Sequence, residues 1–342
     1  VWGMNWITTK MPDSHWMTEA RLKGTKVVVI TVEYSATANK GDDVIVIRPG
    51  TDPAFALGLA QVIMKEKLYD EGFVKRFTDL PKLVRMDTLE PLLAKEVFRN
   101  HRESELSNWT RVLKPGESAG PTTAQNGVQI PAALRGEFAD FVMWNARTGE
   151  PVPVSRDQVG DHFTRSGIDP ALEGTFEITL ADGRTVQARP TFDLTRQYLD
   201  DTLTPENVSK ITWAPAPAIV KLAREIAKNG GKTLFAVGMG PNQFFNNDLK
   251  DRAIFLVAAL TGSIGQLGGN VGSYAGNYRL TLFTGVPRYV AEDPFNVQLG
   301  AAGPVTVRSY VRYESLHYYA AGERILREGR KQFTTGPHVP TP

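Results

Sequence analysis

The run Lys26–Val32, KVVVITV, is the feature of this sequence that most restricts the fold. Its residues are apolar and β-branched without alternation, which is typical of a strand covered on both faces. A second apolar run, Val44–Ile47, leads through a Pro-Gly turn to Asp52-Pro53. Because an N-cap followed by proline begins a helix, a helix is predicted over Ala54–Lys67. Strands and helices with short links favour an α/β fold with doubly wound, mostly parallel sheets.

The chain begins with Val1-Trp2, which has the character of the last residues of a buried strand. A loop is predicted over Gly3–Met11, followed by a helix from Pro12 to about Lys23 that ends at Gly24. Since the first residue is not Met and no signal segment follows, we expect a fragment that starts inside a structural element.

The rest of the chain predicts a second lobe, because 342 residues exceed the roughly 250 to 300 that one hydrophobic core usually serves. Helices are predicted over Thr191–Tyr198, from Pro205 and over Pro217–Lys228, a strand over Thr233–Val237, and a helix from about Asp248 to Thr261. We expect 1–99 with 192–231 to form one dinucleotide-binding-type α/β lobe, 100–191 an irregular insertion with a β-hairpin at 176–189, and 232–342 part of a second α/β lobe plus a connecting segment.

Composition excludes several kinds of chemistry. The chain contains no cysteine, so it cannot by itself form disulfides, iron–sulfur clusters or a thiol nucleophile. Its five histidines are scattered without metal-type spacing, which predicts no metal bound by protein side chains. The formal net charge of +2 argues against a nucleic-acid partner, and no apolar run reaches the 18 residues of a membrane span.

Three loops are placed where open α/β sheets bind ligands, after strands. The first is Gly3–His15, which offers a small residue and polar donors but could equally be an ordinary polar loop. In the second, Glu33 could accept hydrogen bonds from a ribose, or could simply be solvated. In the third, Gly50-Thr51-Asp52, the carboxylate could pair with the N–H edge of a guanine, although capping the helix explains it as well.

Two common nucleotide motifs are absent. A nicotinamide-binding loop needs G-x-G-x-x-G, but Gly238-x-Gly240 is followed by Gln243 where the third glycine belongs. The phosphate-binding G-x-x-x-x-G-K-[ST] of P-loop enzymes does not occur. Dehydrogenase and P-loop kinase functions are therefore disfavoured.

Three blocks of residues resemble a known family. They are Trp2-Gly3-Met4-Asn5 with Thr9 and Pro12-Asp13-Ser14-His15, then Pro49-Gly50-Thr51-Asp52, then Gly238-Met239-Gly240 with Asn242-Gln243, Leu260–Gly265 and Gly268-Gly269-Asn270. In this order they resemble the molybdopterin oxidoreductases of the dimethyl sulfoxide reductase family. Within it, segments 267–279 and 291–296 look most like catalytic α subunits of nitrite oxidoreductase, in the branch with nitrate, perchlorate and selenate reductases. Trp6 departs from a common Pro, and Glu33 from the usual Asp.

The resemblance implies a cofactor, molybdenum bis(molybdopterin guanine dinucleotide), whose metal is held by the sulfurs of the cofactor. A 4Fe-4S cluster in the full-length subunit would have its ligands, like the molybdenum carboxylate ligand, outside this chain. Catalytic residues cannot be assigned. The positions that match the cofactor-binding motifs of the family are Gly3, Asn5, Thr9, His15, Glu33, Gly50, Thr51, Asp52, Gly240, Asn242, Gln243, Gly268 and Gly269.

The implied reaction is two-electron oxygen-atom transfer, with nitrite oxidised to nitrate and electrons passed to an iron–sulfur β subunit. A haem or membrane-anchoring subunit is a further expected partner, and a small oxyanion is the expected substrate. The expected location is periplasmic and membrane-associated through partner subunits, or alternatively the cytoplasmic face. Two alternatives stay open: a nitrate, perchlorate or selenate reductase of the same fold, and a cofactor-free nucleotide-binding scaffold.

Overall fold

The computed structural model describes residues 1–104, 110–112, 115–116, 128–130, 139–155, 158–245 and 249–273. They belong to one compact unit, Val1–Ser273, and a second unit, Tyr274–Pro342, lies outside the described residues. The expected connecting segment up to residue 342 and the residues 246–248 therefore cannot be compared with the structure.

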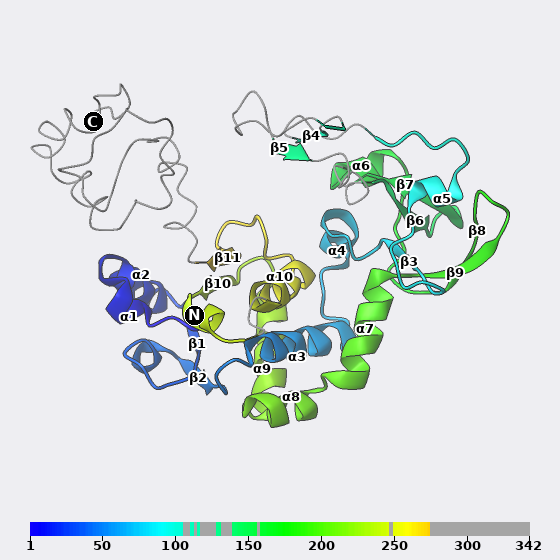
Figure 1. The fold of residues 1–342 in the computed structure, drawn as a ribbon. Helices are drawn as coiled ribbons and strands as arrows, with labels where there is room; N and C mark the ends of the chain where they lie inside the picture. Colours follow the sequence, from blue (N-terminus) through cyan, green and yellow to red (C-terminus); the bar gives the residue numbers. More distant parts are fainter. Residues whose placement is uncertain are drawn as a thin grey trace, which may run out of the picture. The chain divides into compact units, whose positions relative to one another are not determined.

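Helices and strands are mixed along the chain, with runs of strands from β4 to β7 and of helices from α7 to α9 (Figure 1). The helices are α1 (Trp6–Thr9), α2 (Met11–Leu22), α3 (Asp52–Lys65), α4 (Glu71–Phe77), α5 (Ala94–Val97), α6 (Asp161–Arg165), α7 (Thr191–Thr202), α8 (Pro205–Thr212), α9 (Ala216–Lys228) and α10 (Lys250–Leu260), with 3-10 turns η1 (Ala38–Lys40) and η3 (Gly240–Gln243). The strands are β1 (Val28–Thr31), β2 (Asp43–Val46), β3 (Leu83–Arg85), β4 (Thr110–Val112), β5 (Val128–Ile130), β6 (Phe141–Asn145), β7 (Glu150–Val154), β8 (Phe176–Thr179), β9 (Thr185–Pro190), β10 (Leu234–Val237) and β11 (Asn270–Ser273). This mixed α/β composition confirms the predicted class.

Trp2 joins two pairs of parallel strands. β1 pairs with β2 and β10 with β11, both in parallel. Trp2 forms parallel bridges to Ile30 of β1 and Val237 of β10. Its backbone N–H donates to the Ala236 carbonyl at 2.8 Å, and its carbonyl accepts from the Gly238 N–H at 2.8 Å. The N-terminus consequently lies between β1 and β10 (Figure 1). The complete doubly wound arrangement and the division into lobes stay predictions.

Helix α3 forms the centre of the main core. Most of its side chains are buried because its sequence is apolar on nearly every face, and it packs against α7, α8, α9 and α10. Gly58 allows the close approach of α8, since a Cβ at Gly58 would lie 2.9 Å from Cγ2 of Val208. The predicted helix over Ala54–Lys67 is confirmed as Asp52–Lys65, but the expectation that Asp52 caps it is wrong, because Thr51 is the N-cap residue and Asp52 the first residue of the helix.

A second core belongs to antiparallel strands. β9 lies between β3 and β8, and β6 pairs with β7. Buried residues on both sides of position 100 form this core: Leu83, Leu92, Ala94, Val142, Ile178, Leu180, Val186 and Ala188. The predicted hairpin at 176–189 is confirmed as β8–β9. The hairpin β6–β7 was not predicted, because Pro151 and Pro153 interrupt the strand pattern of β7.

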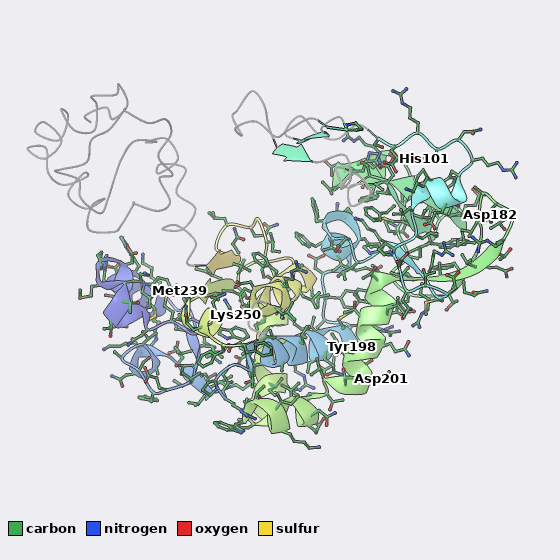
Figure 2. The ribbon with its side chains drawn as sticks, viewed as in Figure 1. His101, Asp182, Tyr198, Asp201, Met239 and Lys250 are labelled. Atoms are coloured by element: carbon green, nitrogen blue, oxygen red, sulfur yellow. The ribbon has the colours of Figure 1, made fainter. Side chains whose placement is uncertain are left out.

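Two buried carboxylates hold neighbouring segments in place. In the region of His101 (Figure 2), the Oδ2 atom of Asp140 lies 2.9 Å from Nε2 of His101 and accepts from the Ser104 hydroxyl at 2.9 Å. On α7, Asp193 accepts hydrogen bonds from Arg189 and Arg196, each at 2.9 Å. Among the described residues, no helix is both long and apolar enough to cross a bilayer.

Candidate functional site

Two glycine-bearing loops interlock where the strands of Trp2 and β10 end. Gly3 has φ +59°, and a Cβ there would lie 2.2 Å from Cγ of Pro241. A Cβ at Gly238 would lie 2.3 Å from the Gly3 carbonyl oxygen, and one at Gly240 would lie 3.0 Å from the same oxygen. Any side chain at Gly3 or Gly238 would therefore push the loops apart. The structure therefore brings the first and third of the resembling sequence blocks into direct contact.

The turn after β2 approaches the same place. Gly50 has φ +80°, and a Cβ there would lie 3.3 Å from Cβ of Phe244, which directly follows η3. Because parallel strands end at one edge of a sheet, this edge gathers Gly3, Gly50 and Gly240. The structure thus brings together the glycines of the three sequence blocks that start at positions 2, 49 and 238.

Asp52 is a buried anchor. It begins α3, is 2% exposed, and its Oδ1 atom accepts a hydrogen bond of 2.7 Å from the indole N–H of Trp2. The Trp2 ring, itself 2% exposed, packs edge-on against Phe55 with centroids 5.5 Å apart. Asp52 therefore ties the start of α3 to the end of the strand that precedes Gly3. Recognition of a guanine by this carboxylate stays a prediction.

Three polar side chains of the predicted site fix the shape of its loops. The Oδ1 atom of Asn5 accepts from the hydroxyl of Thr37 at 2.9 Å, which connects the Gly3 loop to the loop after β1. The Thr9 hydroxyl donates to the Asn5 carbonyl at 2.8 Å, and the Thr51 hydroxyl donates to the Arg48 carbonyl at 2.6 Å. These side chains give the loops a defined conformation before any ligand is considered.

The remaining predicted residues are more accessible. Glu33, Asn242 and Gln243 are exposed, so a carboxylate and two amides face outward from loops that follow strands. His15 lies on α2, half exposed, with its Nε2 atom 3.9 Å from a carboxylate oxygen of Glu19. These groups are chemically suited to hydrogen bonding with ribose, base or pterin.

Gly268 and Gly269 differ from each other. Gly268 has φ +84° and no atom within 4 Å of the position that a Cβ would take, so its backbone is open. A Cβ at Gly269 would lie 2.4 Å from the Ser263 carbonyl oxygen, so Gly269 is required for packing of its own loop. Only the first of the two offers backbone that a ligand can approach.

Sequence reasoning missed a cation and an aromatic ring beside the third loop. Arg48 follows the buried Ile47, just after the end of β2, and its guanidinium carbon lies 5.7 Å from the ring centroid of Trp213. Trp213 is 65% exposed and has φ +66°. The sequence gives one indication that Trp213 ends a helix: the helix pattern that begins at Pro205 stops at this tryptophan, before Ala214-Pro215.

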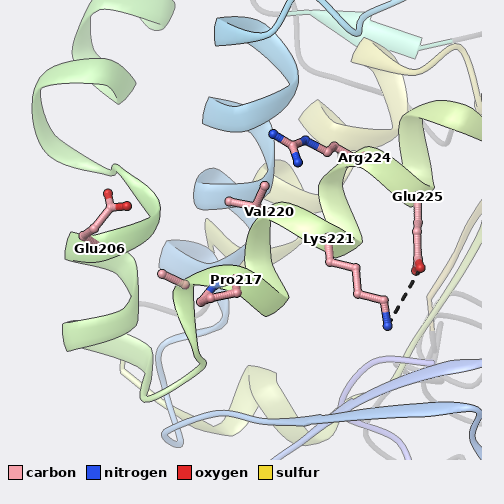
Figure 3. Close-up of a pocket in the computed structure, with 7 residues that line it drawn as sticks. Glu206, Pro217, Val220, Lys221, Arg224 and Glu225 are labelled. Atoms are coloured by element: carbon pink, nitrogen blue, oxygen red, sulfur yellow. Dashed lines mark ion pairs between the residues drawn. The ribbon is translucent and has the colours of Figure 1, made fainter.

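The surface depression on α8 and α9 lies elsewhere (Figure 3). Several of its charged residues are already paired. Lys221 donates to Asp43 at 2.9 Å, Arg224 donates to Glu66 at 2.8 Å, and Glu225 accepts from Lys26 at 2.8 Å. Exposed ion pairs of this kind are common on helix surfaces, and we assign this depression no ligand. Within the described ranges, no group of three or more His, Asp or Glu side chains is arranged to hold a metal ion.

The described residues define a mixed α/β protein with glycine-bearing loops at the ends of parallel strands, where such folds bind nucleotide-like ligands. The model of the molybdopterin oxidoreductase family matches residues 1–323. The chain therefore belongs to the molybdopterin oxidoreductase family, which confirms the resemblance seen in the sequence. Membership implies a molybdenum–molybdopterin cofactor.

Two relatives are informative. The chain is 37% identical over 287 residues to the perchlorate reductase subunit alpha of Dechloromonas aromatica. The aligned region is 84% of this chain and 29% of that protein. It is also 32% identical to the respiratory nitrate reductase subunit alpha of Haloferax mediterranei. Here the aligned region is 83% of this chain and 26% of that protein. The chain thus spans less than a third of the length of these relatives.

Among solved structures, acetylene hydratase from Pelobacter acetylenicus aligns with 78% of this chain and 21% of its own, at 15% identity and a TM-score of 0.37.

The residues at the strand ends fit a molybdopterin cofactor. Glycines allow close approach of a phosphate to backbone, as at Gly268, and exposed amides and a carboxylate can meet polar edges of a nucleotide. Binding of the cofactor by these particular residues stays a prediction.

Proposed function

We propose that this chain is part of the catalytic α subunit of a molybdenum bis(molybdopterin guanine dinucleotide) oxidoreductase. The observation that carries the proposal is the 37% identity, over 84% of the chain, to a perchlorate reductase α subunit. The contact between the Gly3, Gly50 and Gly240 loops supports it, because these are the positions at which the family motifs match.

The residues of this chain bind and orient the cofactor, and the cofactor supplies oxygen-atom transfer and takes up two electrons. Gly268 lets backbone approach phosphate or pterin, while Gly3 and Gly240 let their two loops pack against each other. Asn5, Thr9 and Thr51 keep the loops in shape. Glu33, Asn242, Gln243 and His15 present polar groups to the nucleoside, and Asp52 supports the site through Trp2.

The reaction that we propose for the intact subunit is oxidation of nitrite. Nitrite and water give nitrate, two protons and two electrons, and the electrons pass to an iron–sulfur β subunit. The basis is the resemblance of segments 267–279 and 291–296, most of which lie outside the described residues. A 4Fe-4S cluster in the same subunit and a haem or membrane-anchoring subunit complete the proposed electron path, on the periplasmic side of the membrane.

A second candidate is reduction of an oxyanion by the same fold. It is favoured by the relatives, which are perchlorate and nitrate reductase α subunits. In that direction two electrons and two protons enter and one oxygen atom leaves as water, so the same loops would serve either reaction.

The test is an assay of the purified complex in both directions. We expect nitrite-dependent reduction of an electron acceptor that exceeds nitrate reduction by a reduced dye. Activity only with nitrate, perchlorate or selenate would replace nitrite oxidation with the second candidate. A purified full-length subunit without molybdenum and pterin would contradict both and leave a scaffold that only retains the fold.

A further inference from the structure

Arg48 and Trp213 form an exposed cation–aromatic pair that the proposed function has not used. Trp213 is 65% exposed, and the guanidinium carbon of Arg48 lies 5.7 Å from the centroid of its ring. Arg48 is also exposed. A large aromatic ring in contact with water does not gain the free energy that burial of its apolar surface would provide. A ligand that covers the ring would explain its position.

The backbone around Trp213 is held rigidly. Trp213 has φ +66°, a left-handed conformation that is rare for a bulky residue. Its neighbours Thr212 and Ala214 are both 0% exposed. The N–H of Trp213 donates to the Ser209 carbonyl at 2.9 Å, and the N–H of Arg48 donates to the Thr212 carbonyl at 2.8 Å. The fold thus fixes a strained turn and presents its ring outward.

The pair adjoins the third loop of the candidate site. The carbonyl of Arg48 accepts from the backbone N–H of Thr51 at 3.2 Å and from its hydroxyl at 2.6 Å. Arg48 therefore connects, through its own backbone, the end of α8 with the turn Gly50-Thr51-Asp52. The ring of Trp213 lies next to the end of β2, where a nucleotide bound by this sheet would place part of its structure.

A planar aromatic base matches this pair. A base can stack on an indole ring, and a neighbouring guanidinium adds cation–π attraction and can donate hydrogen bonds to oxygens of the base or its phosphate. We propose that Arg48 and Trp213 form a stacking site for a purine base. This inference rests on the proposed function, in which the base is the guanine of the dinucleotide cofactor.

A protein partner is the competing occupant, since Trp and Arg are frequent in protein interfaces. The base is favoured by the position of Arg48, whose carbonyl holds the Thr51 hydroxyl of the turn after β2, because open α/β sheets bind nucleotides beyond the carboxyl ends of their strands.

The variant that tests the stacking site is Trp213→Gly in the full-length subunit. Glycine adopts φ +66° without strain, so the change removes the ring without harming the turn. Trp213→Phe keeps an aromatic face. Tyr198→Ala is the matched control, since Tyr198 is a 60% exposed aromatic residue on α7 (Figure 2).

The measurement is calorimetric titration of cofactor-free subunit with GMP and with ribose 5-phosphate. We expect Trp213→Gly to weaken GMP binding by roughly 10-fold and Trp213→Phe by less than about 3-fold, because stacking on an aromatic ring is lost in one and kept in the other. Ribose 5-phosphate should bind all variants equally, and Tyr198→Ala should match wild type.

The outcomes separate this inference from the proposed function. If Trp213→Gly binds GMP as tightly as wild type while the purified subunit contains molybdenum and pterin, the stacking site is wrong and the proposed function stands. If Trp213→Gly instead loses a partner subunit and keeps GMP affinity, the pair is a protein interface and the inference is overturned. If wild-type subunit contains no pterin, the proposed function itself fails.

Discussion

At the scale of single residues, the candidate site depends on two kinds of residue. Some are glycines, whose lack of a side chain lets loops pack closely, and others are polar residues whose side chains form hydrogen bonds within the protein. The glycines at positions 3 and 238 leave room for neighbouring backbone and for Pro241. The carboxylate of Asp52 and the hydroxyls of Thr9 and Thr51 are directed at groups of the chain itself. Residues of this kind set where a loop lies, and the exposed residues beside them can then contact a ligand.

Gly3→Ala should be strongly destabilising. A methyl group would meet Cγ of Pro241 at 2.2 Å while the backbone stays at φ +59°, so we expect a loss of about 3 kcal/mol in the free energy of unfolding. Urea denaturation measures the change. Gly183→Ala is the matched control, since Gly183 has φ +92° but no atom within 4 Å of its Cβ position, and should cost only about 1 kcal/mol. Equal losses in the two variants would contradict a steric role for Pro241.

Asp52→Ala should lower the free energy of unfolding by about 2 kcal/mol, because it leaves the buried indole N–H of Trp2 without its acceptor. Asp52→Asn keeps an oxygen at the same place and should lose less than about 1 kcal/mol. Because the side chain is 2% exposed, we also expect Asn to retain guanine nucleotide in the full-length subunit. A large loss of nucleotide in Asp52→Asn would show that the carboxylate itself contacts the base.

At the scale of elements, the sequence predicted those helices and strands that are marked by a hydrophobic period or by helix start and stop residues. β1, β2, α3, the β8–β9 hairpin and the helices between α7 and α10 lie close to their predicted positions because apolar runs, prolines and a turn at Asp182-Gly183 mark them. α1 lies in the segment predicted as a loop, and β11 was not predicted, since short elements next to glycines lack a period. The contact between Gly3 and Pro241 could not be predicted, because it depends on which strands become neighbours.

Helix packing at Gly58 gives a prediction for α3. Alanine is a better helix former than glycine by about 1 kcal/mol, yet the new methyl group would lie 2.9 Å from Val208. We therefore expect Gly58→Ala to destabilise the protein by about 1 to 2 kcal/mol. The double variant Gly58→Ala/Val208→Ala should be more stable than the sum of the two single changes predicts. Simple additivity in urea denaturation would argue against direct packing of α3 on α8.

The junction of β9 and α7 should respond to acid. Burial would raise the pKa of Asp193, but hydrogen bonds from Arg189 and Arg196 outweigh it and hold this pKa below its ordinary value of 3.8. The resulting stability is present above pH 3.8 and is lost as the pH falls through 3.8 and then through the lower folded value. Urea midpoints measured from about pH 6 down to about pH 2 should fall less steeply in Asp193→Asn. An unchanged slope would contradict this assignment.

At the scale of the whole molecule, loops from distant parts of the sequence meet at one sheet edge. The bridges of Trp2 to Ile30 and Val237 make this possible, and the second core around β3, β6, β8 and β9 is built from a separate set of residues. A ligand at the strand ends should therefore affect the first group of loops and leave the second core unchanged.

Hydrogen exchange of the full-length subunit, with and without its cofactor, tests this division. Removing the cofactor should speed exchange in peptides that cover 1–10, 48–56 and 238–245, because ligand binding stabilises the loops it contacts. Peptides from the β8–β9 hairpin serve as the internal control and should be unchanged. Faster exchange confined to the hairpin would place the cofactor elsewhere.

The position of Trp2 between β1 and β10 also sets the order in which the chain can fold during synthesis. Its pairing with Ile30 can form early, but its partner on the other side, Val237, is made far later. At about 5 to 20 residues per second, roughly 10 to 50 s pass before that partner leaves the ribosome. During this interval the growing chain carries an open strand edge, which is the kind of surface that pairs with other chains. We therefore expect the growing chain to be prone to aggregation before β10 is translated, and chaperones that shield the strand of Trp2 and β1 to act in this interval.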